Sequence, residues 1–135
     1  LEEVLALPGG NEIVTDQVLY NLKRRGIEWD LLPFCRAQHL PVMAYSPIEH
    51  SGRTQKRMLD DPTLQSIASR HDATPAQIAL AWLIQQEVVV IPKASTSEHV
   101  RENHEALRLV LSEAELSELD QAFPPPARKI PLEVK

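Results

Sequence analysis

Residues 88–93 read VVVIPK, and this stretch decides the fold. Four consecutive β-branched residues are typical of a strand that is buried on both faces, as the strands of a parallel sheet are. Pro92 has no amide hydrogen to offer a neighbouring strand, so the strand is expected to end there. The sequence therefore predicts a short strand over Val88–Ile91, buried on both faces, within a parallel sheet.

Two further strands are expected upstream, separated by a helix. The first covers Glu12–Leu19 after a Gly-Gly break, and the second covers Leu40–Tyr45, which reads LPVMAY. Asp30–His39 lies between them and carries apolar residues at helical spacing, which predicts a helix. Residues 49–56 are polar with one glycine and are predicted to form a loop.

Four helix starts carry the side chains that satisfy free amides. Asp61 stands before Pro62, and the TPAQ and SEAE tetrads that begin at Thr74 and Ser112 are capping boxes. Thr96 is expected to cap a helix that runs to about Leu107. The last helix is expected to end before three prolines at 124–126, and the tail to residue 135 is predicted to be extended.

The alternation of strand and helix predicts an α/β fold with a parallel sheet. A glycine-rich G-x-G-x-x-G loop is absent and the chain has only four glycines, which disfavours a doubly wound dinucleotide fold. The alternative is a (β/α)₈ TIM barrel, which takes roughly 250 residues. With 135 residues and about three strands, the chain is interpreted as the C-terminal half of such a barrel, residues 1–123, followed by the tail, 124–135. Residues 1–7 are predicted to be the end of a helix already in progress, so we expect a fragment.

Composition excludes several classes of function. The net charge of −5 and the lack of a basic stripe disfavour a nucleic-acid partner. There is no apolar run long enough to span a membrane, and the single cysteine, Cys35, fits a reducing cytoplasm. The five histidines have no metal-ligand spacing, so no metal site is expected.

Four segments, in order, resemble the aldo-keto reductase family. DQVLYNL at 16–22 is similar to the family's sixth strand, and VMAYSPI at 42–48 to its seventh. VIPKASTSEHVREN at 90–103 is similar to the motif after strand eight, and TPAQIALAW at 74–82 to the helix before that strand. Each piece alone is weak, but four in the right order are specific.

The resemblance implies an NADP(H) site. Gln17, at the C-terminal end of its strand, would bind the nicotinamide carboxamide, and Tyr45 would stack on the ring. The loop of Ser46, Pro47 and Ile48 would pass the pyrophosphate, and Lys93 would meet the ribose 2′-phosphate. The remaining residues of the site lie at the start of one helix, where backbone amides favour phosphate. They are Ser95 and Thr96, near phosphate, with His99, Glu102 and Asn103 toward the adenine.

Three positions depart from the family pattern. Asp16 stands where an asparagine is usual, Ala94 replaces a serine and His99 replaces an arginine. An arginine is permanently charged whereas a histidine is largely neutral at neutral pH. These departures bear on the preference for NADP over NAD, which is the less expected cofactor, more than on dinucleotide binding itself.

The family's Asp–Tyr–Lys–His tetrad has no counterpart here, so no catalytic residue is assigned. The resemblance implies a parent enzyme that reduces aldehydes or ketones with NADPH, this chain carrying the cofactor half. The alternative is a catalytically inactive, truncated half-barrel with no enzymatic role. On either hypothesis the open sheet edges are expected to make the chain self-associate. Hydride transfer measured with this chain alone would contradict the prediction that it is inactive. The reading frame upstream of Leu1 distinguishes the two hypotheses, because a catalytic tetrad encoded there would favour the parent enzyme.

Overall fold

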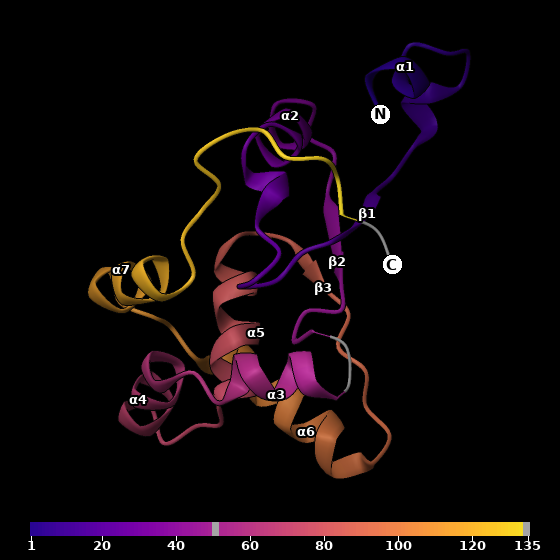
Figure 1. Cartoon of the computed structure of the whole chain (residues 1–135). Helices are drawn as coiled ribbons and strands as arrows, with labels where there is room; N and C mark the ends of the chain where they lie inside the picture. Colours follow the sequence, from indigo (N-terminus) through magenta and orange to yellow (C-terminus); the bar gives the residue numbers. More distant parts are fainter. Residues whose placement is uncertain (50–51, 134–135) are drawn as a thin grey trace.

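The computed structural model describes residues 1–49 and 52–133 and contains one parallel sheet. Its strands are β1 (Asp16–Leu19), β2 (Val42–Tyr45) and β3 (Val89–Val90), in the spatial order β1-β2-β3. Three parallel strands with covering helices confirm the predicted fold class. The strands lie near the middle of the view in Figure 1, with β2 between its neighbours.

The helices follow the strands in the expected alternation. The α-helices of the described residues are α1 (Glu2–Leu5), α2 (Leu31–Ala37), α3 (Arg53–Leu59), α4 (Pro62–Arg70), α5 (Pro75–Gln85), α6 (Ser97–Glu105) and α7 (Glu113–Ala122). Short 3-10 turns cover Gly10–Glu12, Gly26–Glu28 and Ala106–Arg108. The tail after α7 has no helix or strand up to residue 133, and its last two residues lie outside the described part.

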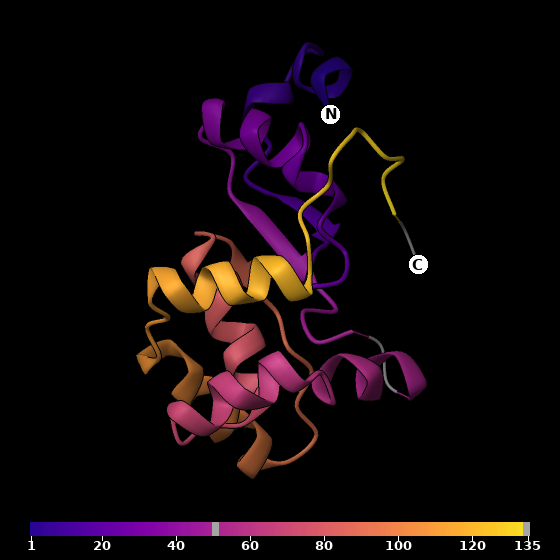
Figure 2. The same cartoon turned by 60° about the vertical axis from the view of Figure 1, so that its left-hand side comes forward.

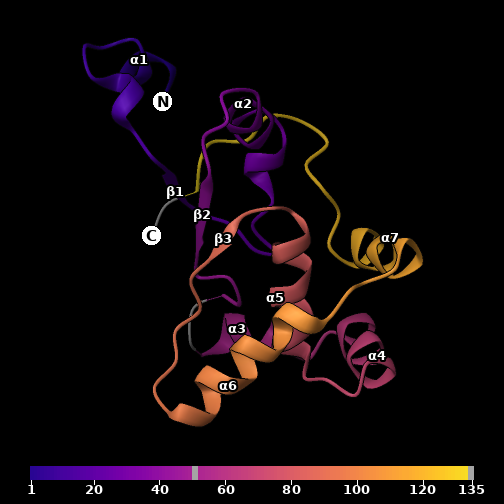
Figure 3. The same cartoon turned by 180° about the vertical axis from the view of Figure 1, so that it is seen from behind.

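Helices cover one face of the sheet and leave the other face open. The views of Figures 1 and 3 show α2, α5 and α7 on the same side of the strands. Val89 and Ile91, on the other face, are 47% and 39% exposed. The prediction of a strand buried on both faces is therefore wrong for this chain, because β3 is an edge strand and only one of its faces has a helical neighbour.

Two other expectations need correction. β1 begins at Asp16 rather than Glu12, and Val14 before it is 78% exposed, because Gly10–Glu12 forms a 3-10 turn instead. The predicted loop over 49–56 is wrong from Arg53 onward, where α3 begins, while residues 50 and 51 lie outside the described part. Met58 at the end of α3 is fully buried, so tertiary packing stabilises a helix that its polar composition did not indicate.

The predicted helix caps are confirmed. The carboxylate of Asp61 accepts from the amides of Thr63 and Leu64, and the hydroxyl of Thr96 accepts from the amide of His99. Both capping boxes form as well, at the starts of α5 and α7. The helix after Thr96 ends slightly early, since Glu105 closes α6 and a 3-10 turn continues to Arg108.

The core centres on α5, which is apolar on nearly every side. Its Trp82 is 1% exposed and lies against the ring of Tyr20, with 5.4 Å between ring centroids and an interplanar angle of 59°. The guanidinium of Arg25 sits 5.0 Å above the Trp82 ring. Arg25 also pairs with Glu28 and Asp120, at 2.7 Å each, so it joins the segment after β1 to α7.

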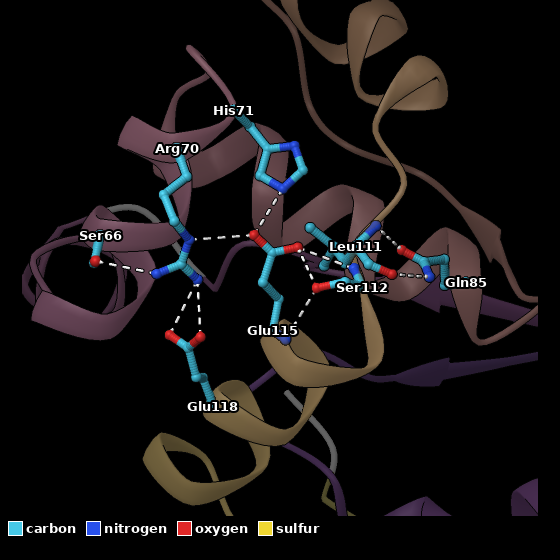
Figure 4. Close-up of polar contacts among 8 residues, drawn as sticks. All are labelled: Ser66, Arg70, His71, Gln85, Leu111, Ser112, Glu115 and Glu118. Carbon is cyan, nitrogen blue, oxygen red and sulfur yellow. Dashed lines mark hydrogen bonds and ion pairs between the residues drawn. The ribbon is translucent and has the colours of Figure 1, made fainter.

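A polar cluster joins α4 to α7 (Figure 4). One oxygen of Glu115 lies 2.9 Å from Nε2 of His71 and accepts from Nε of Arg70 at 3.3 Å. Its other oxygen accepts from the backbone amide and the hydroxyl of Ser112, at 2.9 Å each. Arg70 donates in turn to both oxygens of Glu118 at 3.0 Å. The glutamate of the capping box thus also anchors the end of α4.

Acid is expected to destabilise this contact between α4 and α7. The backbone amide of Ser112, first, and then His71 lower the pKa of Glu115 from 4.5 to about 2. The unfolded chain therefore binds more protons than the folded chain between these values, so stability present above pH 4.5 falls as the pH drops toward 2. We expect a loss of about 1–2 kcal/mol from this carboxylate, discounted for screening at its partly exposed partner Arg70.

Urea unfolding measured at neutral and acidic pH checks this prediction. The Glu115→Gln variant should show a flatter dependence of the free energy of unfolding on pH than the unchanged chain. Glu118→Gln is the matched control, because its carboxylate is 41% exposed and should leave the dependence nearly unchanged. Equal slopes for the unchanged chain and Glu115→Gln would contradict the assignment.

Candidate functional site

The register of the sheet puts Gln17 and Tyr45 on the same open face. Gln17 pairs with Met43, which pairs with Val89, and Leu19 pairs with Tyr45. Residues two apart on a strand share a face, so both predicted nicotinamide contacts project from the side that lacks helices. By strand rise and strand spacing their Cα atoms are about 8 Å apart.

One detail of the sequence prediction is wrong. Gln17 is the second residue of β1 rather than its C-terminal end, and Leu19 occupies that end. The cause is that β1 continues beyond Gln17, since its pairing with β2 runs as far as Leu19 opposite Tyr45. Gln17 itself is exposed, so its amide is available to a ligand on the open face. Asp16 beside it is half-buried and belongs to the opposite face.

The turn after β2 has an unusual backbone. Ser46 and Glu49 have φ angles of 50° and 64°, in the left-handed region that side chains other than glycine rarely adopt. The amide of Glu49 donates to the carbonyl of Ser46 at 3.1 Å, which closes the turn around Pro47 and Ile48. Such strained backbone gathers at binding and catalytic sites, where the surroundings hold it in place.

Asn21 is the residue that holds this turn. It is fully buried, and its Nδ2 donates to the carbonyl of Ser46 at 2.9 Å and to Oε1 of Glu49 at 3.3 Å. Its Oδ1 accepts from the amides of Lys23 and Arg24, at 2.9 and 3.0 Å. One side chain therefore ties the segment after β1 to the turn after β2.

Replacing Asn21 by leucine is expected to cost about 2–3 kcal/mol of folding free energy, because buried partners lose their hydrogen bonds. The same change should expose the Glu49 amide, which amide hydrogen exchange measures directly. Asn11→Leu is the matched control, since Asn11 is exposed and lies in a 3-10 turn. A loss no larger than that of the control would show that the turn does not depend on Asn21.

The segment that follows β3 leaves the sheet at the same edge as the turn after β2. The amide of Ile91 donates to the carbonyl of Ala44 at 3.3 Å, so the chain leaves β3 alongside the end of β2. Lys93 follows two residues later and is exposed, and Ser95 and Thr96 are exposed at the N-terminus of α6. Free amides of a helix start favour an anion in front of them.

The other predicted contacts lie along α6. His99 is exposed, whereas Glu102 and Asn103 are half-buried. The carbonyl of Glu102 accepts from Nε2 of Gln77 at 3.0 Å, and the same amide reaches the carboxylate of Glu105 at 3.2 Å. Gln77 is the second member of the α5 capping box, so the start of α5 also fixes where α6 lies. Figure 2 shows α6 beside α5, beyond the strands.

Most of the chain matches one known protein family. The sequence pattern described as "Aldo/keto reductase family" matches residues 2–123. The chain belongs to the aldo/keto reductase family. It is 47% identical to methylglyoxal reductase YeaE of Escherichia coli strain K12, over 99% of this chain and 48% of that protein. It is 34% identical to aldo-keto reductase family 1 member A1 of Cricetulus griseus, over 67% of this chain and 30% of that protein.

Solved aldo-keto reductases share the fold. An aldo-keto reductase from Klebsiella pneumoniae in complex with NADPH superposes with a TM-score of 0.94 at 42% identity, covering 99% of this chain and 48% of that one. A second structure from the same organism, with NADP and acetate, gives the same values. The chain thus spans about half the length of the E. coli relative and of these structures, and its sheet and helices match about half of the barrel.

Tyr20 does not share the open face of the sheet. It is fully buried beside Trp82, and its hydroxyl donates to Oε1 of Glu28 at 2.7 Å. Burial, first, and then the charge of Glu28 raise the pKa of Tyr20 well above its usual range. Tyr20 is therefore a packing residue, because it is fully buried against α5 and does not reach the open face.

Within the part of the chain that the structure describes, no group of three histidine, cysteine, aspartate or glutamate side chains is placed to hold a metal ion. Among residues 1–49 and 52–133, no helix is long and apolar enough to cross a bilayer. Cys35 is buried in α2, and burial raises the pKa of its thiol.

Sequence reasoning assigned no role to Asn21, Arg24 or Glu49. Asn21 is part of the DQVLYNL motif at 16–22, and Glu49 lies in a predicted loop. Their partners are 25 and 28 residues away, so no local pattern connects them. Asn21 in the DQVLYNL motif is the one available signal, since an amide in a strand-end motif is suited to bridging backbone groups.

Proposed function

We propose that this chain is the NADP(H)-binding half of an oxidoreductase that reduces aldehydes or ketones by hydride transfer. The observation that carries the proposal is that the candidate cofactor contacts lie on one face and at one edge of the sheet. Gln17 and Tyr45 lie on one open face, and the strained turn and the start of α6 lie at the edge where β2 and β3 end. The NADPH bound to the Klebsiella pneumoniae relative supports the same cofactor.

The residues fit the chemistry of a dinucleotide. An amide side chain such as Gln17 both donates and accepts, which suits a carboxamide, and an aromatic ring such as Tyr45 suits a flat heterocycle. Lys93 offers a positive charge beside a helix start that offers amide hydrogens, which suits phosphate. When bound, the dihydronicotinamide supplies the hydride. The chain's own task is to orient the ring and to hold the phosphates.

The departures from the family pattern at Ala94 and His99 bear on the preference for NADPH over NADH. A serine and an arginine at these places would add donors toward a 2′-phosphate, whereas Ala94 has none and His99 is an exposed imidazole. Lys93 therefore carries most of the discrimination between NADPH and NADH in this chain. We propose that the preference for NADPH is retained through this one side chain.

The proton donor for the carbonyl belongs to the half of the enzyme that these residues do not include. Tyr20 is buried, and Tyr45 is assigned to the ring of the cofactor. On this proposal the unit of residues 1–123 forms the cofactor half, the tail 124–135 extends beyond it, and the chain alone turns nothing over. The name of the E. coli relative, a methylglyoxal reductase, supports a small carbonyl compound as substrate of the parent.

Calorimetric titration of the chain with NADPH and then NADH tests the proposal. Tighter binding of NADPH than of NADH is expected, and hydride transfer to an aldehyde should not exceed that of a denatured control. Light scattering on the same sample shows whether the binding species is a monomer. Absence of binding, with a folded chain by circular dichroism, would contradict the assignment of the cofactor half to this chain.

A further inference from the structure

Residues 129–133, called the strap here, lie across a cavity and are held near both ends by ion pairs. Nζ of Lys129 is 2.6 Å from Oδ2 of Asp30, at the start of α2. At the other end Nη1 of Arg24 is 2.6 Å from Oε1 of Glu133. The strap belongs to the tail drawn in yellow in Figures 1 and 3, which passes α2 and returns toward β1.

The cavity under the strap has a volume of about 560 Å³ and a mainly apolar lining. The strap contacts its floor closely at one point, because a Cβ atom on Gly26 would lie 2.8 Å from Ile130. Leu19, at the end of β1, is 4% exposed although it shares the open face with Gln17. The apolar lining comes from Leu19, Ile27 and Leu31 below and from Ile130, Pro131 and Leu132 above.

Arg24 contacts the strap and the turn after β2 at the same time. Its Nε donates to Oε1 of Glu49 at 2.9 Å, while its Nη1 donates to Oε1 of Glu133 at 2.6 Å. Glu49 is 6% exposed, whereas the Arg24 and Glu133 side chains are each about one-third exposed. A guanidinium presents its donors in a rigid fork, so the position of one carboxylate constrains the other.

We propose that Arg24 couples the strap to the turn of Ser46–Glu49, so that closing the strap over the cavity and ordering the turn are one linked equilibrium. A closed strap holds the Arg24 fork in the orientation that pairs with Glu49, and Glu49 then keeps the strained turn closed. An open strap frees the fork, and the turn loses a charged partner. The link between strap and turn does not depend on the proposed function. Only the role of this turn as a cofactor contact rests on it.

The strap is built to open readily. Within the described residues no backbone hydrogen bond joins residues 129–133 to the rest of the chain. Its Lys129–Asp30 pair is largely exposed, at 73% and 46%, and its Arg24–Glu133 pair is about one-third exposed on each side. Such solvent-accessible pairs contribute little and weaken with salt. The strap is therefore expected to populate both states, and the turn should follow it.

Nuclear magnetic resonance on the 135-residue chain, without cofactor, tests the coupling. A nitroxide attached through Leu132→Cys reports strap closure by broadening the amides of Gly26 and Asp30, while buried Cys35 stays unlabelled. The hydrogen-exchange rate of the Glu49 amide, measured on unlabelled protein, reports the turn. In the unchanged chain the broadening should be strong at low salt and weaker at high salt.

The Glu133→Gln variant separates coupling from simple opening. It alters neither Arg24 nor Glu49, yet we expect weaker broadening and exchange of the Glu49 amide several times faster. Arg24→Lys should behave alike, since a lysine keeps the charge but not the fork. Lys129→Gln is the matched control, and any weakening of the broadening there should be accompanied by proportionally faster exchange at Glu49.

Three results would overturn the proposal. The first is that the amides of Gly26 and Asp30 are not broadened in the chain without these substitutions. The second is that Glu133→Gln does not weaken the broadening. The third is that the strap opens but the exchange rate of the Glu49 amide stays the same. Because no cofactor is present, these outcomes are independent of the proposed function. A chain that fails to bind NADPH but shows linked strap and turn would overturn the cofactor assignment and leave the coupling in place.

Discussion

Replacing Lys93 by methionine is expected to weaken the binding of NADPH by roughly ten- to a hundredfold and to leave the binding of NADH nearly unchanged. Hydrogen bonds to charged groups are worth about 1.5–3 kcal/mol, and each 1.4 kcal/mol is about a factor of ten in affinity. The ammonium of Lys93 is exposed at the edge where β2 and β3 end. Methionine keeps a similar length and removes the charge, so the loss should fall on the ligand with the additional phosphate.

Titration calorimetry with both dinucleotides measures the two affinities. Lys56→Met is the matched control, because Lys56 lies on α3 and its ammonium already pairs with Asp60 at 3.0 Å. That variant should bind both ligands as the unchanged chain does. Equal losses of NADPH and NADH affinity in Lys93→Met would show that Lys93 contacts a part that the two cofactors share, and the proposed basis of preference would be wrong.

Replacing Trp82 by alanine is expected to reduce the free energy of unfolding by about 3–5 kcal/mol, as truncation of large aromatic residues in cores does. This is a large share of the roughly 5–15 kcal/mol that stabilises a typical domain. Trp82 is 1% exposed, and the change removes its contacts with the ring of Tyr20 and with the guanidinium of Arg25. The segment after β1 and the end of α7 meet at Arg25, so both should loosen together.

Urea unfolding followed by circular dichroism measures this loss. Trp29→Ala is the matched control, since Trp29 is 48% exposed and should cost under about 1 kcal/mol. If Trp82→Ala unfolded as late in urea as the control, the core would not depend on α5 as the structure indicates. Should Trp82→Ala fail to fold at all, Trp82→Phe provides a milder change with a measurable transition.

Local signals in the sequence placed most elements correctly. Asp61, Thr74, Thr96 and Ser112 were each predicted to cap a helix, and each accepts from a backbone amide two or three residues ahead. These interactions depend only on neighbouring residues, so any fold that contains them forms them alike. The order of four motifs indicated the family by the same kind of information, and the family match confirms it.

The candidate site was predictable only as a set of residue types. Gln17, Tyr45 and Lys93 came from motif positions, and their assignment as cofactor contacts remains a prediction. Their arrangement depends on register, which no local signal sets, and the register puts Gln17 two residues before the end of β1. Residue patterns specify which faces are apolar. Pairing between strands 25 or more residues apart specifies which residues become neighbours across the sheet.

The sequence by itself determined the alternation of strands and helices, the helix starts and the family, because those follow from contacts within a few residues or from ordered motifs. Only the tertiary structure decided which face of β3 is covered, that Met58 stabilises α3, and that Arg24 bridges Glu49 and Glu133. The last pair of contacts spans 25 and 109 residues of chain. Charges so far apart in sequence become partners only when packing of the whole chain brings them within hydrogen-bonding distance.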